Sequence, residues 1–271
     1  MNRGLLEKSL RETWRMTLLY AGVLFAFEAI IAYVLPMFQA ELRGSWLEVE
    51  FVRKLLEALL GAELGASFGP AFLQAFPWVH PVILSVLWAH EVTYCTRVPA
   101  GEIDRGTIDF LLGLPVSRRQ VYLCDTVVLL GCGAVLIGSL LLGNGFGTSL
   151  ATEAIAPEPA RTVVVLVNLG ALYVAVGGVA YLVTAFCDHR GRAVAIVFVV
   201  LLASFLVNLL AQFWEIAQAI RFLSILSYYQ PIHILRDDAF PYVDVGVLVA
   251  VGAITWWLGG RVFSRRDICT V

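Results

Sequence analysis

The chain has 271 residues, of which 59% are hydrophobic and 15% are charged, and its mean hydropathy is +0.82. Soluble domains carry about 25% charged residues, so this composition excludes an ordinary soluble protein and indicates an integral membrane protein. The formal net charge of −2 gives the chain no overall attraction to nucleic acid, and we expect no nucleic-acid partner.

Six apolar segments follow one another along the chain. Each is long enough, or nearly so, to cross a bilayer as a helix of roughly 20 residues. None alternates between polar and apolar residues, which argues against a β-barrel. We therefore predict an all-α integral membrane protein with one transmembrane domain over residues 1–271. The predicted spans cover about residues 17–35, 71–95, 121–143, 162–187, 192–214 and 244–263.

The first 16 residues include the amphipathic sequence LLEKSLRETWRM and predict an interfacial helix that runs into the first span. Two further segments have apolar residues at helical spacing. Residues 46–60 predict an amphipathic helix on the outer membrane face, and residues 214–229 predict a similar one. The aromatic side chains of the second segment suit the membrane interface.

Glu28 lies midway along the first span, where an unpaired carboxylate costs several kcal/mol. Two interpretations stay open. Glu28 belongs to a transport pathway or gate, or it is a structural group that is protonated or paired with Asn168, Asn208 or a tyrosine hydroxyl. Asn168 and Asn208, in spans four and five, are also pathway candidates, or they bond between helices.

Residues 102–119, EIDRGTIDFLLGLPVSRR, place six charged residues between two apolar segments. We expect residues 101–114 to form about four helical turns with an apolar and a charged face. The apolar face carries Ile103, Thr107, Phe110 or Leu111, and Leu114. The charged face carries Glu102, Arg105 and Asp109. An exposed amphipathic helix between two spans favours a partner-binding surface.

Pro115 ends this helix because it lacks an N–H and disfavours helix at the preceding residue. Ser117 and Gln120 predict a capping box that starts a second helix, which becomes span three. Arg118 and Arg119 lie at its N-terminus, where the macrodipole disfavours each cation by roughly 0.3–1 kcal/mol. Anionic lipid, worth about 1 kcal/mol per basic residue, at least cancels that cost.

Basic residues are unevenly divided between two sets of loops. Of the 19 Lys and Arg, 13 lie in residues 1–16, 96–120, 188–192 and 261–271. The other 6 lie in residues 39–70, 144–161 and 215–244. Because cytoplasmic loops are enriched in Lys and Arg, we predict a multi-pass protein of the cell (inner or plasma) membrane with both termini in the cytoplasm.

The segment 102–119 resembles the cytoplasmic elbow of ABC type-2 transporter permeases. The resemblance is carried by Glu102, Arg105, Gly106, Thr107, Leu111, Leu112, Leu114, Pro115, Val116, Ser117 and Arg118. The N-terminal interfacial helix, SYYQP at residues 227–231 and FSRRDI at residues 263–268 agree with it. The subgroup that looks most similar includes the permease of nitrous oxide reductase maturation, whose substrate we do not carry over.

The resemblance implies an exporter subunit that works as a dimer with a second copy or a sibling. It implies that the elbow docks onto a separate cytosolic ATPase subunit, which binds the ATP and magnesium, so we expect no cofactor in this chain. The implied docking residues are Glu102, Ile103, Asp104, Arg105, Gly106, Thr107, Phe110, Leu111, Leu114, Pro115 and Arg118.

Enzyme motifs find no support in the sequence. Neither Lys8 nor Lys54 lies in a GxxxxGK[ST] loop. Residues 65–69 match G-x-S-x-G without the preceding strand that a nucleophile elbow needs. His90-Glu91 lacks the second histidine of H-E-x-x-H. We expect no catalytic residue, no metal site and no enzymatic activity in this chain.

Two other functions stay open. One is a self-contained ion-coupled carrier or channel that uses Glu28 as its coupling group. The other is a membrane scaffold without transport activity. A neighbouring ATPase gene would favour the ATP-driven transporter over both. The few polar groups in the spans favour an apolar or lipid-like cargo, although metal-related cargo stays open.

Overall fold

The computed structural model describes residues 2–38, 70–151, 158–211, 213–237 and 239–267. Within these ranges, five helices are long and apolar enough to cross a membrane. They are α1 (Arg3–Val34), α8 (Arg118–Leu150), α9 (Pro159–Phe186), α10 (Arg190–Leu210) and α13 (Tyr242–Arg265). The predictions for spans one, three, four, five and six each coincide with one of these helices.

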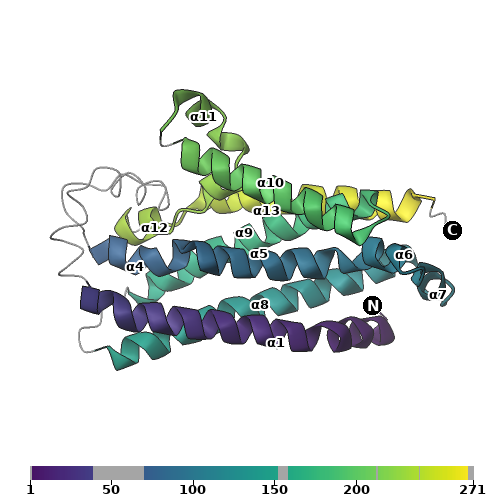
Figure 1. Ribbon diagram of the computed structural model, residues 1–271, viewed down its shortest axis with the longest axis horizontal. Coiled ribbons are helices and arrows are strands. Elements are labelled where there is room, and N and C mark those ends of the chain that lie inside the picture. Colours follow the sequence, from purple (N-terminus) through teal and green to yellow (C-terminus); the bar gives the residue numbers. More distant parts are fainter. Residues whose placement is uncertain (1, 39–69, 152–157, 212, 238, 268–271) are drawn as a thin grey trace.

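The long helices lie side by side in one elongated bundle (Figure 1). Both termini lie at the same end of this bundle, together with the short helices α6 (Glu102–Asp104) and α7 (Ile108–Leu112). The opposite end holds α12 (Pro231–Asp237). A chain with the six predicted spans would have both termini on one side in this way.

The second predicted span is two helices, α4 (Pro70–Val79) and α5 (Pro81–Cys95). They lie end to end beside α1 (Figure 1). His80 between them is extended, with φ −60° and ψ 128°, because Pro81 disfavours helix at the residue before it. The pair covers the predicted segment, but neither helix alone has the roughly 20 residues of a spanning helix.

The first helix differs from the prediction, because the interfacial helix and the first span form one continuous element. α1 has 32 residues. At 1.5 Å per residue it is about 48 Å long, against a hydrocarbon core of about 30 Å. One buried stripe runs along its whole length, so its first turns pack on the bundle: Leu5, Ser9, Thr13, Thr17, Ala21, Leu24, Glu28 and Ala32.

The predicted four-turn helix over residues 101–114 is wrong. The chain forms a π-helical turn, η2 (Arg97–Gly101), then α6, a break and α7. Gly106 has φ +67°, which a residue without a Cβ adopts readily. The Thr107 hydroxyl donates to the Glu102 carboxylate across this break. A side-chain bond of this kind competes with helical backbone bonding.

The start of α8 is as predicted. The Ser117 hydroxyl accepts a hydrogen bond from the Gln120 N–H at 3.2 Å, and the Gln120 side chain accepts one from the Ser117 N–H at 2.9 Å. This reciprocal pair is the expected capping box.

The predicted amphipathic helix over residues 214–229 is also wrong. The segment is divided into α11 (Glu215–Ala219) and the 3₁₀ turns η3 (Arg221–Leu223) and η4 (Ile225–Tyr228). Ser224 interrupts it in an extended conformation, and its hydroxyl donates to the Ser204 carbonyl of α10 at 2.8 Å. The predicted helix at residues 46–60 and the motif at residues 65–69 lie outside the described residues.

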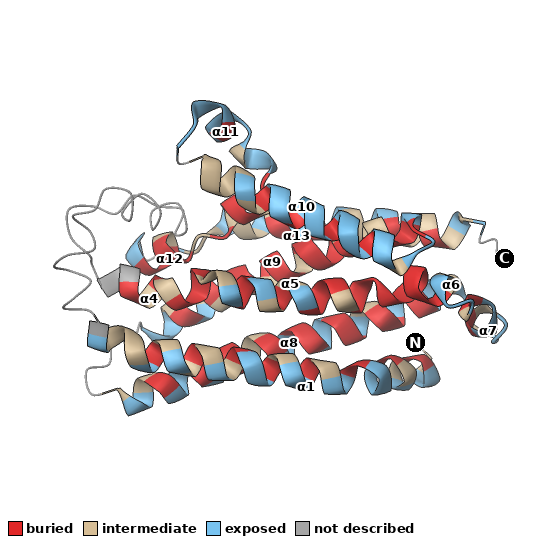
Figure 2. Ribbon diagram, in the orientation of Figure 1, coloured by how far each residue is buried: buried red, intermediate tan, exposed pale blue. Residues whose placement is uncertain are grey.

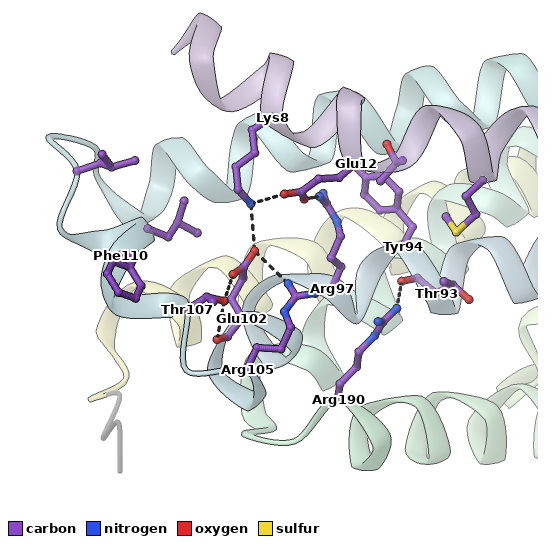
Figure 3. A pocket seen from close by; sticks show the side chains of 14 residues that line it. Lys8, Glu12, Thr93, Tyr94, Arg97, Glu102, Arg105, Thr107, Phe110 and Arg190 are labelled. Carbon is purple, nitrogen blue, oxygen red and sulfur yellow. Dashed lines mark hydrogen bonds and ion pairs between the residues drawn. The ribbon is translucent and has the colours of Figure 1, made fainter.

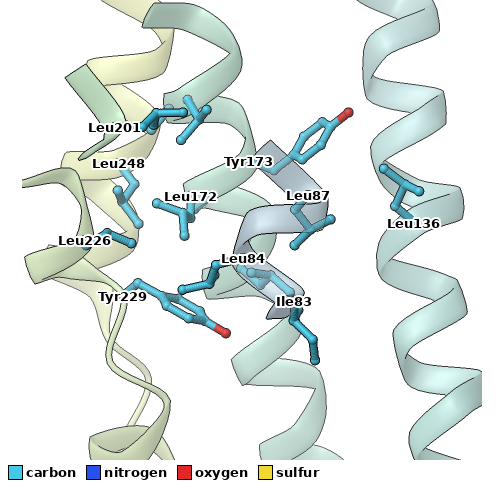
Figure 4. Packing of buried hydrophobic residues seen from close by; sticks show 14 of the residues in the cluster. Ile83, Leu84, Leu87, Leu136, Leu172, Tyr173, Leu201, Leu226, Tyr229 and Leu248 are labelled. Atoms are coloured by element: carbon cyan, nitrogen blue, oxygen red, sulfur yellow. The ribbon is translucent and has the colours of Figure 1, made fainter. Parts of the chain in front are cut away.

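The core lies where α5, α8 and α9 meet. Leu84 and Leu87 of α5 lie near Leu172 of α9, with Leu136 of α8 on one side and Tyr229 on the other (Figure 4). Buried residues line the faces turned to the centre, whereas α10 is exposed along much of its length (Figure 2). Exposed apolar helix faces suit contact with lipid.

Small residues bring α1 and α8 into close contact. An ideal Cβ on Gly143 would lie 2.5 Å from the Phe25 carbonyl oxygen, and one on Gly147 would overlap the Ala29 carbonyl. The two glycines are four residues apart and therefore share one face of α8. This is the small-xxx-small pattern by which helices approach closely in membranes.

We expect Gly147→Ala to lower the midpoint of thermal unfolding in detergent, because overpacking a tight contact costs about 1–3 kcal/mol. Gly145→Ala is the matched control, since a Cβ there meets nothing within 4 Å. Equal midpoints for the two variants would contradict the close approach of α1 and α8.

Candidate functional site

A cavity of about 680 Å³ opens at the end of the bundle that holds both termini. It lies between the start of α1, the end of α5, the start of α10 and residues 102–119, which we call the elbow. Lys8 and Glu12 come from α1, Thr93 and Tyr94 from α5, and Arg190 from α10 (Figure 3). The cavity is rich in charge, unlike the apolar core beside it.

Glu102 fixes the elbow to α1. Its buried carboxylate accepts a hydrogen bond from the Lys8 ammonium at 3.0 Å and from Thr107, and it pairs with Arg105 at 3.3 Å (Figure 3). Burial alone would raise the pKa of Glu102, but the Thr107 and Lys8 hydrogen bonds and the two cations lower it below the usual value. Glu102 and Arg105, two residues of the predicted charged face, therefore form an ion pair.

Asp104 fixes the elbow to the turn before α10. One carboxylate oxygen lies 2.9 Å from Nδ1 of His189, and the other accepts from the Arg190 backbone N–H at 3.3 Å. The hydrogen bond with His189 lowers the pKa of Asp104. Two neighbouring carboxylates thus hold one short segment to two different long helices.

The apolar residues of the elbow face two ways. Ile108 and Leu111 are buried, and they pack with Leu5 of α1 in a small cluster. Phe110 is 81% exposed and Leu114 is 52% exposed. Phe110 and Leu111 were expected as alternatives on one apolar face. In α7 Leu111 is the one that is buried, whereas its neighbour Phe110 is exposed.

The docking residues implied by the resemblance divide by exposure. The exposed ones are Asp104, Arg105, Gly106, Phe110, Leu114 and Pro115. Those that are half-buried or buried are Glu102, Ile103, Thr107, Leu111 and Arg118.

Arg118 binds within the bundle. Its guanidinium donates to the Phe263 carbonyl at 3.2 Å and to the Arg266 carbonyl. Both carbonyls lie at the C-terminus of α13, where unpaired acceptors and the negative end of the macrodipole favour a cation. This contact, rather than lipid alone, offsets the unfavourable position of Arg118 at the start of α8, whereas Arg119 is exposed.

A buried ionic cluster, which the sequence reasoning missed, lies next to the cavity. The Arg97 guanidinium donates to the Asp125 carboxylate, to the Ser9 hydroxyl and to the partly exposed Glu12 carboxylate. Arg97 and Asp125 are both buried. This cluster therefore joins α1, η2 and α8 through one side chain.

Two tyrosines complete the cluster around Asp125. The Tyr181 hydroxyl of α9 donates to the second carboxylate oxygen at 2.9 Å, and the Tyr94 hydroxyl of α5 donates to the Asp125 carbonyl at 2.9 Å. A carboxylate inside an apolar segment was the signal that pointed to Glu28, and Asp125 offered the same signal within span three. Arg97, just after span two, was the matching cation.

Glu28 is fully buried in the bundle. Its Oε1 accepts a hydrogen bond from the Asn144 amide at 2.8 Å, and Oε2 has no hydrogen-bond partner among the described residues. The partner is thus on α8, and it is neither of the asparagines considered from the sequence. The close contact of Gly143 with α1 places the neighbouring Asn144 within reach.

Asn168 and Asn208 do not take part in the hydrogen bonding of Glu28 within the described residues. The Asn168 amide donates to the Tyr228 carbonyl at 3.1 Å and accepts from the Gln230 N–H at 3.2 Å. It thereby fastens the SYYQP segment to α9. Asn208 is half-buried on α10. Within the described part of the chain, no hydrogen bond joins either asparagine to Glu28.

We expect Arg97→Gln to lower thermal stability strongly, because breaking a buried ion pair costs about 3–5 kcal/mol. The double variant Arg97→Met/Asp125→Leu should recover part of the loss, since no charge is then left unpaired. Arg11→Gln removes the exposed Arg11–Glu7 pair and serves as the control, with an expected cost of about 0–1 kcal/mol. A melting midpoint for Arg97→Gln equal to that of Arg11→Gln would contradict the cluster.

Comparison with known families adds an independent finding. Residues 11–268 match the family model described as ABC-2 family transporter protein. The match covers nearly the whole chain, including the elbow, α1 from residue 11 onward and the other four long helices. A search of curated proteins gave no match.

Proposed function

Since the chain belongs to the ABC-2 family of transporter proteins, we propose that it is the membrane-spanning subunit of an ATP-driven exporter powered by a separate ATPase subunit. In this proposal α4 and α5 together form one of six crossings, and both termini and the elbow lie in the cytoplasm. The plasma membrane is the proposed location, following the excess of basic residues at this end. Within the family, we propose the subgroup that includes the permease of nitrous oxide reductase maturation, without its substrate.

The exposed pair Phe110 and Leu114 is the observation that carries the docking proposal. Exposed apolar side chains on a short charged segment suit a partner surface. The segment is also firmly held, because Glu102 binds α1 and Asp104 binds the start of α10. A surface with both properties can receive a partner and pass its movement to two long helices.

The coupling proposed here runs from the partner to the spans. ATP and magnesium bind in the ATPase subunit, whose closure displaces the elbow. The two carboxylate contacts move α1 and α10, and the Arg97 cluster carries the displacement to α8 and α9. A second copy or a sibling chain forms a dimer, and the cargo crosses between the two.

We expect Phe110→Ala/Leu114→Ala to reduce co-purification of the ATPase subunit from mild detergent by roughly 30-fold, the effect of losing about 2 kcal/mol at an interface hot spot. Phe222→Ala/Leu223→Ala is the matched control. These residues are 63% and 68% exposed, and they lie in η3, far from the elbow.

Mass spectrometry identifies what co-purifies with each tagged chain. Equal recovery of the ATPase with both double variants would place its docking surface elsewhere. Absence of an ATPase from an intact wild-type sample would favour the carrier or scaffold functions.

One specific observation supports the alternative function of an ion-coupled carrier. Oε2 of Glu28 is buried and has no hydrogen-bond partner among the described residues. We expect Glu28→Cys to stay protected from a membrane-impermeant thiol reagent with and without ATP, because Glu28 is fully buried in the bundle. The background chain has its five native cysteines replaced. Exposed Ser149→Cys is the positive control. Labelling of position 28 in either state would support a role in the pathway.

A further inference from the structure

A second cavity, of about 490 Å³, lies between α5 and α10. Its lining is mainly apolar and includes Trp88 of α5 with Phe198 and Leu201 of α10. On α5 it extends from Pro81 to Thr93, which corresponds to about 18 Å at 1.5 Å per residue. That length is close to one leaflet of a hydrocarbon core about 30 Å thick. We call this cavity the α5–α10 groove.

The groove meets the charged cavity at Thr93, which lines both. Arg190 lies at this junction, and its guanidinium donates to the Thr93 carbonyl at 3.0 Å (Figure 3). The other cations of the charged cavity, Lys8, Arg97 and Arg105, each pair with a carboxylate. Among the described residues, no carboxylate forms an ion pair with the Arg190 guanidinium.

An apolar groove about one leaflet long, ending beside an arginine whose guanidinium forms no ion pair among the described residues, is complementary to an amphiphile with an acyl chain and a negative head group. Basic pockets between membrane helices on the cytoplasmic side suit anionic lipid head groups. Arginine also matches the geometry of phosphate oxygens. We propose that the α5–α10 groove binds an anionic phospholipid, with its phosphate at Arg190 and one acyl chain beside Trp88.

The site is tested by quenching of tryptophan fluorescence with lipids that carry brominated acyl chains. The full-length protein is placed in bilayers that contain either brominated phosphatidylglycerol or brominated phosphatidylcholine. The chain has seven tryptophans, so the Trp88 signal is the difference between the wild type and Trp88→Phe. The readout needs neither ATP nor the ATPase subunit, so its result is independent of the proposed function.

In the wild type, the anionic lipid should quench Trp88 at about fivefold lower mole fraction than the neutral lipid, the preference expected from one basic residue. Arg190→Gln should abolish this preference, whereas Arg190→Lys should retain most of it. Arg119→Gln removes an exposed arginine at the same end of the bundle and should leave it unchanged. Retention by Arg190→Lys separates loss of charge from misfolding.

Three results would overturn the assignment. Equal quenching by the two lipids, or an unchanged preference in Arg190→Gln, would remove the head-group site. Protection of Trp88 from both lipids would show that a second copy of the chain covers the groove.

Discussion

The contact between the Arg97 guanidinium and the Asp125 carboxylate is the interaction on which this end of the bundle depends. Both charges are buried, so neither is stable without the other. The hydroxyls of Ser9 and Tyr181 bond to the pair from α1 and α9. Helices that lie in lipid gain little from apolar contact with each other, so such polar contacts and close packing define their register.

The elbow is built outward from this fixed end. Two of its carboxylates bind the bundle, since Glu102 binds Lys8 and Asp104 binds His189, and the apolar side chains of Phe110 and Leu114 are exposed. The segment is therefore not a free helix, because it is bonded to both α1 and the start of α10. Under the proposed function, these contacts let a short, irregular segment both present a surface to the partner and transmit a displacement to the long helices.

The positions of the long helices were predictable from the sequence because bilayer thickness dictates the length of an apolar segment. Residues 162–187 and 244–263 fall within three residues of the bounds of α9 and α13. The capping box at Ser117 was predictable too, since it is local in sequence. Continuous helices were wrongly predicted at the elbow and at residues 214–229. There Thr107 and Ser224 form side-chain bonds that depend on the folded chain.

The candidate site was harder to predict, because its bonded residues are far apart along the chain. The sequence places Asp125 in an apolar span and Arg97 in a loop. These two residues are 28 positions apart, so their direct bond could not be seen from the sequence. Glu28 was recognised, but its partner Asn144 lies 116 positions away, and only the close contact between α1 and α8 brings them together. Polar residues within apolar segments can be found from the sequence, but their bonding partners depend on tertiary packing.

The continuous α1 also links the site to the thickness of the membrane. Lys8 and Glu28 are twenty positions apart on one unbroken helix, which corresponds to about 30 Å. A rod longer than the hydrocarbon core adjusts to a thinner bilayer by tilting, at a cost of fractions of a kcal/mol per Å of mismatch. Because Lys8 at the end of that rod holds Glu102, such a tilt would shift the elbow as well. Under the proposed function, the thickness of the membrane therefore acts on the same Lys8–Glu102 contact that transmits the partner's movement.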